Sequence, residues 1–255
     1  MWLAAEGGRV ITDSAGDTIM GGDLIKRHRL VTRLWHWLNA VVLAVMLMSG
    51  LMIFNAHSRL YWGQEGFDRG NAWLVLGRFP GWITIPSHYS LADARLWHLS
   101  FAWLLIGASG FYLIWSLIAG HLRRNIVPKL AELSPAHVWH DIKEHAQLRF
   151  PTGAAALHYN VLQKLAYGSV LLVMLPGIIL TGLTMSPGMN AAWPWLLDLF
   201  GGRQSARSLH FIFAFGLVGF FVVHIAMVVL AGPINEVRSM ITGWYRLPRE
   251  REEQS

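Results

Sequence analysis

Four long runs of apolar residues constrain this chain more than any other feature of its sequence. They cover roughly residues 34–54, 96–119, 165–183 and 209–231. Runs of 18 or more apolar residues are typical of membrane spans, because only a helix that pairs its own backbone groups can cross about 30 Å of hydrocarbon. A soluble all-helical protein would alternate polar and apolar faces along each helix, and these runs do not. The sequence therefore predicts an all-α fold, an integral membrane four-helix bundle.

Composition supports this and excludes several kinds of site. Charged residues make up only 14% of the chain, where a soluble domain carries about a quarter. There are no cysteines, which excludes disulfides, thioether-attached haem, iron–sulfur clusters and thiolate zinc sites. The first 25 or so residues lack the basic and apolar regions of a cleavable signal. We expect a flexible tail over 1–25, a transmembrane domain over 26–244 and a polar tail over 245–255.

The distribution of lysine and arginine predicts the orientation. Of the 21 basic residues, fourteen lie before the first span, in the connection between the second and third spans, or after the fourth, and Lys164 lies near the same side. Loops rich in Lys and Arg stay in the cytoplasm, so we expect both termini there. The net charge of +6 follows from this asymmetry and does not indicate nucleic-acid binding.

Three connecting segments are expected to have structure of their own. The outer segment "GRFPGWITIP" (77–86) reads as an ordered loop, and "AAWPWLLDLF" (191–200) as a short interfacial helix. On the inner side, "SPAHVWHDIKEHAQL" (134–148) suggests an amphipathic helix on the membrane surface. The outer segments are candidate docking sites for a partner protein.

Four of the twelve histidines lie inside the predicted spans: His36, His98, His210 and His224. An ionisable residue within a span is costly and usually functional. His210 and His224 are 14 residues apart, which on a helix is about 40° short of four full turns, so both share one face about 21 Å apart. The first span runs outward, and the second and fourth run inward. His36 therefore lies at the inner level with His224, and His98 lies at the outer level with His210.

Two histidine pairs stacked across a membrane suit two b-type haems, each iron taking one imidazole from either side. An arginine precedes three of these histidines by three residues: Arg33, Arg95 and Arg207. Residues at this spacing share a helix face, so each guanidinium could pair with a haem propionate, although arginines also flank spans as anchors. Gly107, Gly110, Gly216 and Gly219 could admit a flat macrocycle or serve plain helix packing.

The spacing of these histidines resembles the di-haem cytochrome b subunits of nickel-iron hydrogenases, formate dehydrogenases and thiosulfate reductases. The segments "FPGWITIP", "LWHLSFAWL", "GHLRRNIVP", "YNVLQKLAY" and "GGRQSARSLH" are similar to a bacterial cytochrome b561-like branch associated with molybdopterin oxidoreductases. The resemblance implies a subunit of the bacterial inner membrane that carries electrons between a peripheral oxidoreductase subunit, docked on the outer loops, and the quinone pool. It implies a quinone pocket beside the inner haem, where Asn160, Gln163 and Lys164 supply polar groups.

Two other functions remain open. A stand-alone cytochrome b561-type enzyme that oxidises superoxide and reduces quinone would share the helix and haem plan, but it would not need the long outer loops. A transporter or anchor without haem would need intramembrane charges or broken helices, and the break at Pro176-Gly177 is the feature that fits. His121 and His158 are candidates for proton transfer, and no residue is assigned a catalytic role.

Overall fold

A computed structural model of the chain describes residues 11–12, 18–19, 22–147 and 159–247. Most of the predicted N-terminal tail, and residues 248–255 of the C-terminal one, lie outside this range. The chain divides into two compact units. The terminal unit comprises Met1–Leu34, Gly120–Tyr167 and Val223–Ser255, and the bundle unit comprises Trp35–Ala119 and Gly168–Val222.

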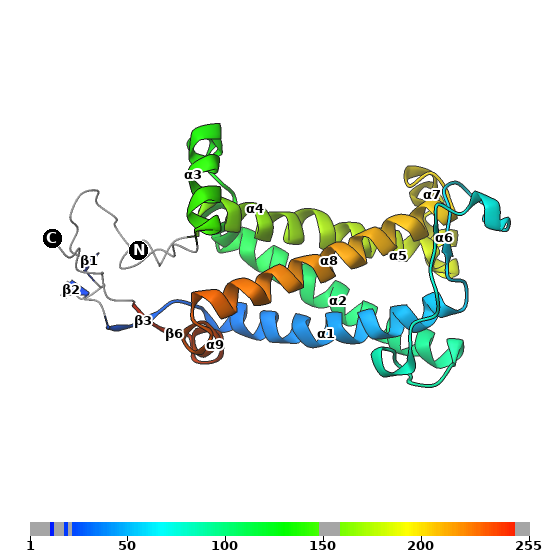
Figure 1. Ribbon diagram of the computed structural model, residues 1–255, viewed down its shortest axis with the longest axis horizontal. Coiled ribbons are helices and arrows are strands. Elements are labelled where there is room, and N and C mark those ends of the chain that lie inside the picture. The colour runs from blue at the N-terminus through cyan, green and yellow to red at the C-terminus, as the bar shows by residue number, and fades with distance from the viewer. Residues whose placement is uncertain (1–10, 13–17, 20–21, 148–158, 248–255) are drawn as a thin grey trace. The chain divides into compact units, whose positions relative to one another are not determined.

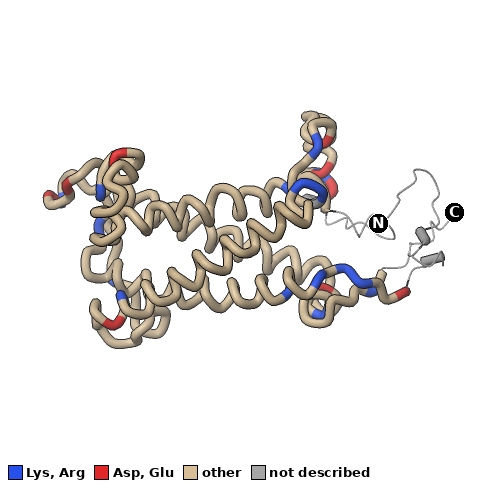
Figure 2. Tube along the Cα trace, turned by 180° about the vertical axis from the view of Figure 1, so that it is seen from behind, with Lys and Arg blue, Asp and Glu red and all other residues tan. Residues whose placement is uncertain are grey.

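Four long helices are present where the apolar runs predict them (Figure 1). They are α1 (Leu30–Asn55), α2 (Leu91–Ile118), a composite helix over Val161–Met185 and α8 (Arg203–Ala231). All four are long and apolar enough to cross a membrane. Lys, Arg, Asp and Glu gather at the helix ends and in the connections, and the middles of the helices lack them (Figure 2).

Apolar side chains from all four spans meet in one core of the bundle unit. The core consists of Val42, Met46, Leu105, Leu175, Ile178 and Leu217. Other large side chains of the same helices face outward, such as Phe111 and Ile118, which is 84% exposed. Soluble proteins rarely expose so large an apolar surface, whereas in a membrane the lipid chains cover it. The prediction of a membrane bundle rather than a soluble helical protein is confirmed.

The third span is assembled from three segments: α4 (Val161–Ser169), the π-helical turn η6 (Val170–Met174) and α5 (Leu175–Met185). Pro176 in the first turn of α5 has no N–H to donate, and the wider π turn before it absorbs this interruption. A Cβ atom at Gly177 would lie only 2.5 Å from the Phe213 ring of α8. The glycine therefore allows α5 and α8 to pack closely.

The connection between α1 and α2 is ordered, as predicted. Strands β4 (Arg59–Leu60) and β5 (Leu74–Val75) pair antiparallel. The short helix η1 (Arg69–Asn71) lies between them in the chain, and η2 (Gly81–Ile83) follows β5. The Asn55 side chain bonds both backbone groups of Phe79, at 2.9 and 2.7 Å. The connection is also bound to the start of α8, because Ser208 Oγ donates to Tyr61 O at 2.6 Å.

The segment 191–200 differs from the single short helix that the sequence suggests. It holds the end of α6 (Pro187–Ala192) and then α7 (Trp195–Leu199). Pro194 stands between the two helices, and its missing N–H explains why one helix does not continue into the other. In the connection between α2 and α4, α3 (Pro135–Ala146) matches the predicted amphipathic helix.

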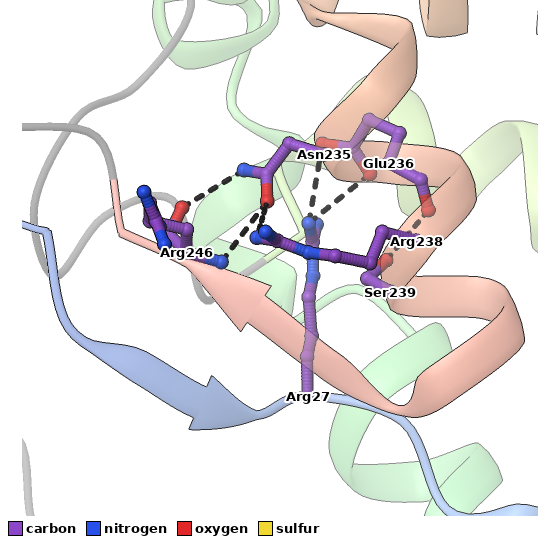
Figure 3. A network of polar contacts seen from close by, with 6 residues as sticks. All are labelled: Arg27, Asn235, Glu236, Arg238, Ser239 and Arg246. Atoms are coloured by element: carbon purple, nitrogen blue, oxygen red, sulfur yellow. Dashed lines mark hydrogen bonds and ion pairs between the residues drawn. The ribbon is translucent and has the colours of Figure 1, made fainter.

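In the terminal unit the two ends of the transmembrane domain pair with each other. Strand β3 (Leu24–Lys26) runs antiparallel to β6 (Trp244–Arg246), and Ile25, Tyr245 and Leu247 form a small buried cluster. The helix α9 (Pro233–Thr242) precedes β6. Figure 3 shows how Arg27 reaches α9, where its Nη1 lies 3.2 Å from a carboxylate oxygen of Glu236. A second strand pair joins β1 (Ile11–Thr12) to β2 (Thr18–Ile19).

Candidate haem-binding sites

His98 of α2 and His210 of α8 lie side by side in the bundle unit. Their ring centroids are 6.2 Å apart, and the ring planes are inclined by 63°. The two residues are 112 positions apart in the sequence, so the packing of α2 and α8 brings them together.

Hydrogen bonds fix which nitrogen of His98 carries the proton. Its Nδ1 lies 3.1 Å from the backbone oxygen of Met46 and 3.1 Å from Ser49 Oγ, both on α1. A carbonyl oxygen can only accept, so Nδ1 must donate. Ser49 Oγ is free to accept as well, because its own proton goes to Val45 O at 2.7 Å. The other ring nitrogen, Nε2, is left with an available lone pair.

His210 is held in the same way by the third span. Its Nδ1 lies 3.0 Å from Ile178 O and 3.1 Å from Thr181 Oγ1, and Thr181 Oγ1 donates to Gly177 O at 2.7 Å. The two supports share the local sequence Ser-Gly-Leu (49–51) or Thr-Gly-Leu (181–183). Two helical hairpins thus present two imidazoles by one repeated arrangement.

Gly50 and Gly182, next to these hydroxyl residues, lie against the imidazoles. A Cβ atom at Gly50 would lie 3.3 Å from Cε1 of His98, and one at Gly182 would lie 3.3 Å from Cε1 of His210. Neither the two glycines nor the two hydroxyl residues were predicted from the sequence. The available signal was the repeated [Ser/Thr]-Gly-Leu, one copy in each of the spans that precede α2 and α8.

The four glycines that the sequence suggested for a macrocycle have different surroundings. A Cβ atom at Gly107, Gly110 or Gly219 would meet nothing within 4 Å among the described residues. At Gly216 it would lie 3.3 Å from Cε of Met174. The first three positions therefore have open space beside them, and Gly216 is a helix-packing position.

His36 lies near the start of α1, and His224 lies in α8, 14 residues after His210 and on the same uninterrupted helix. Both side chains are partly buried. The His36 ring meets Trp37 edge to face, with centroids 5.1 Å apart. His36 belongs to the bundle unit and His224 to the terminal unit, and the pairing of the two stays a prediction.

The three arginines differ in their surroundings. Arg95 is exposed in the first turns of α2. Arg207 donates to the backbone oxygens of Arg59, at 3.0 Å, and His57. Arg33 donates to the backbone oxygen of Ile241, near the end of α9. Arg33 and Arg207 thus bind backbone carbonyls within the described chain, and their pairing with propionates stays a prediction.

The polar residues suggested for quinone binding also have structural partners. Asn160 Oδ1 accepts from the backbone N–H of Gln163 at 2.8 Å, and Gln163 Oε1 accepts from the backbone N–H of Asn160 at 3.3 Å. This reciprocal pair caps the start of α4. Lys164 Nζ lies 2.7 Å from a carboxylate oxygen of Glu132. The quinone role of all three stays a prediction.

Two histidines outside the spans have a pKa below the ordinary value, which favours the neutral imidazole. Burial first, and then the charges of Arg29 and Arg124, lower the pKa of His121. Burial and the charges of Arg207 and Arg59 lower the pKa of His57. His158, the other candidate for proton transfer, lies outside the described residues. Within the described ranges, no three or more His, Asp or Glu side chains cluster in a way that could hold a metal ion.

Known proteins resemble this chain over most of its length. The family described as prokaryotic cytochrome b561 matches residues 27–243. A protein of Azospira oryzae described as a protein-methionine-sulfoxide reductase subunit, YedZ1, is 29% identical over 83% of this chain and 94% of its own length. A protein of Azotobacter vinelandii described as a Ni/Fe-hydrogenase B-type cytochrome subunit is 23% identical over 83% of this chain and 84% of its own length. No solved structure matches the chain significantly.

The family match covers all four spans and all four intramembrane histidines. A multi-pass bundle with imidazoles in its interior is what a membrane protein needs to hold haem without covalent attachment. The chain therefore belongs to the prokaryotic cytochrome b561 family, as a multi-pass haem-b electron-transfer protein of the bacterial inner membrane.

Proposed function

We propose that this protein is a di-haem cytochrome b that carries electrons between a peripheral oxidoreductase subunit and the quinone pool. One haem would be held by His98 and His210, the other by His36 and His224. The termini would lie in the cytoplasm, with residues 26–244 as the haem-carrying domain. The observation that supports the proposal most is the His98–His210 pair.

The separation of this pair fits a haem iron. A metal lies about 2 Å from a bound imidazole nitrogen, and that nitrogen lies about 1.1 Å from its ring centroid, so two imidazoles on opposite sides of one iron have centroids roughly 6 Å apart. The observed separation is 6.2 Å. Both Nδ1 atoms donate to backbone carbonyls, which leaves both Nε2 atoms as ligands. The donor set therefore fits a haem held by His98 and His210.

A second haem is supported by the geometry of α8. This helix is continuous from Arg203 to Ala231, so His210 and His224 share one face about 21 Å apart along its axis. His36 is an imidazole of α1 within the membrane, and it gives His224 a candidate partner.

His98 with His210, and His36 with His224, would hold the two haems, and haem held in this way would supply one-electron transfer rather than a substrate site. The residues of the chain supply ligation, orientation and insulation. Ser49 and Thr181 hold the imidazoles in one orientation and, by accepting from Nδ1, make Nε2 a more basic ligand. The apolar core around Met46 and Ile178 keeps water away.

The peripheral partner is proposed from the relatives and from the exposed surface. Both relatives are described as subunits of larger oxidoreductases, and by resemblance the partner of this chain would be of the molybdopterin-containing kind. The α1–α2 connection and the α6–α7 segment expose large aromatic side chains, including Phe67, Trp82 and Trp195. Aromatic residues are enriched where proteins dock. On the other side, quinone would react near Asn160, Gln163 and Lys164.

Haem content tests the di-haem proposal. The purified chain is extracted into alkaline pyridine, and protohaem is counted per polypeptide, beside a dithionite-reduced minus oxidised spectrum. We expect two haems, falling to one in His98→Ala and in His36→Ala. His88→Ala removes an exposed histidine of the α1–α2 connection and should leave the count at two. One haem per parent chain would contradict the second haem site. No haem in a folded preparation that was supplied with haem would contradict the proposed function.

Co-purification tests the partner. The tagged full-length chain is isolated from its native membrane in mild detergent, and bound proteins are identified by mass spectrometry. We expect a redox-cofactor-containing peripheral subunit, lost when Phe67, Trp82 and Trp195 are replaced by serine. A chain that carries two haems and reduces quinone without such a subunit would instead be the stand-alone b561-type enzyme.

A further inference from the structure

A pocket of about 540 Å³ opens in the terminal unit. It is lined by Gly120, Arg123, Arg124, Val127, Lys129 and Lys164. Four of these six residues are cationic, and the lining that the structure describes includes no acidic side chain. Electrostatics alone therefore favours an anion in this pocket.

The guanidinium of Arg124 is fixed at the pocket wall by the backbone. Its Nε donates to the backbone oxygen of Gly120 at 3.2 Å. Gly120 has a φ of 65°, and a Cβ atom there would lie 2.7 Å from Nη2 of Arg124. A glycine at this position therefore gives the chain the left-handed turn and leaves room for the guanidinium. A cation held in place in this way loses little conformational freedom when it binds a ligand.

Lys164 is partly neutralised by Glu132, and the exposed Arg123 and Lys129 add positive charge to the pocket. Its Nζ lies 2.7 and 2.8 Å from the two carboxylate oxygens of Glu132. Burial raises the pKa of Glu132, but the hydrogen bond from Lys164 and the charges of Lys164 and Lys129 together lower it. Glu132 is thus ionised at neutral pH and offsets the charge of Lys164.

The pocket lies at the ends of two membrane spans. Gly120 and Arg123 follow the end of α2 at Ile118, and Lys164 lies in the first turn of the third span. Residues at span ends sit at the level of the lipid headgroups. Val127 lines the pocket and is exposed, and nearby Leu130 is 90% exposed. Apolar surface beside a cationic pocket suits a ligand that has both an anionic group and acyl chains.

The chemistry of the cations selects the anionic group. Arginine binds phosphate in a bidentate manner, and lysine binds it as a point charge. A quinone ring can accept hydrogen bonds from these cations but carries no charge to balance theirs, so the ligand favoured here differs from the quinone of the proposed function, whose three residues share only Lys164 with this lining. We propose that the pocket binds a phosphate group, that of an anionic phospholipid in the surrounding bilayer.

Lipid binding by the full-length, haem-loaded protein tests this. The protein is placed in phosphatidylcholine nanodiscs with or without phosphatidylglycerol, and native mass spectrometry counts retained phosphatidylglycerol across a titration. The test variant is Arg123→Ala/Lys129→Ala, which changes two exposed residues. The control is Arg69→Ala/Arg78→Ala, which removes two exposed cations from the α1–α2 connection. A haem spectrum like that of the parent verifies that each variant is folded. If the double variant loses this spectrum, Arg123→Ala alone is tested in its place.

We expect the pocket variant to bind phosphatidylglycerol roughly tenfold more weakly and the control to bind as the parent does. Phosphorus NMR of inorganic phosphate, added to the parent in phosphatidylcholine alone, separates the two sources of phosphate. If the parent binds inorganic phosphate, the pocket variant does not, and neither prefers phosphatidylglycerol, the pocket binds phosphate but its ligand is a soluble phosphate and not a lipid. Equal binding by parent, variant and control, or equal losses in variant and control, would overturn the proposal.

Discussion

Ser49 Oγ lies 3.1 Å from Nδ1 of His98, and the Ser49 proton is already committed to the backbone of its own helix. The serine therefore accepts from the imidazole. Thr181 repeats the relation with His210 at 3.1 Å. Each imidazole is thus oriented by the span that precedes it, before any ligand is bound.

Replacing Thr181 by valine removes one acceptor from His210 Nδ1 and leaves the Ile178 carbonyl. Loss of such an outer partner typically costs 10–100-fold in affinity, and we expect about tenfold weaker haem binding at this site. The less basic imidazole should also raise the midpoint potential of that haem. Haem titration of the apoprotein and a redox titration measure the two effects.

Thr184→Val is the matched control, because Thr184 Oγ1 donates to the backbone oxygen of Thr181 and is buried in the same helix. It should leave the potential unchanged. Equal shifts in both variants would mean that the effect comes from the backbone of α5 and not from the hydrogen bond to His210.

Replacing Gly182 by alanine places a Cβ atom 3.3 Å from Cε1 of His210. The ring must then move by a few tenths of an ångström, although ligation tolerates little displacement. We expect the haem count to fall from two towards one, measured after extraction into pyridine. Gly188→Ala in α6, where nothing lies within 4 Å of the new Cβ, should keep both haems. Full occupancy in Gly182→Ala would show that this contact does not constrain the ring.

The sequence predicted the spans well, because the apolar runs are long and the requirement of the membrane is strict. Their ends were less predictable. α8 begins at Arg203, six residues before its apolar run, because the backbone N–H groups of Gln204 and Ser205 donate to the Gly63 carbonyl in the α1–α2 connection. No local pattern encodes such a contact.

The histidines could be found in the sequence because an imidazole in a span is rare. Their supports could not, because serine, threonine and glycine are common in membrane helices. Ser49 and Gly50 gain their role only when the packing of α1 on α2 brings His98 beside them. The arginine pattern, in turn, did not predict that Arg207 binds the carbonyls of Arg59 and His57, because these depend on the path of the α1–α2 connection.

The ion pair between Arg27 and Glu236 connects the segment before α1 to α9 (Figure 3). Both side chains are largely buried, at 14% and 22% exposed, so the two should be coupled by about 1–2 kcal/mol. A double-mutant cycle of Arg27→Ala and Glu236→Gln, followed by thermal unfolding in detergent, measures this. Additive effects of the two substitutions would show that the ion pair contributes nothing.

The ion pair between Glu132 and Lys164 should make stability depend on pH. The native pKa of Glu132 is below its ordinary value of 4.5, so the pair stabilises the protein above that pH and is lost as the pH falls through the native pKa. We expect Glu132→Gln to lower the unfolding free energy by about 1–3 kcal/mol at neutral pH, with a difference that shrinks in acid. Glu65→Gln, at an exposed site, should show neither effect. A pH-independent loss would identify packing as the cause.

The repeated support of His98 and His210 has a consequence for biogenesis. The hairpin of α1 and α2 is synthesised before α8, and it contains both His98 and the groups of α1 that bond its Nδ1. A cofactor that needs both imidazoles can be captured only once the last helix has entered the membrane. Haem binding at this site would then report that the last helix has been inserted. A chain truncated before α8 would contain His98 without His210.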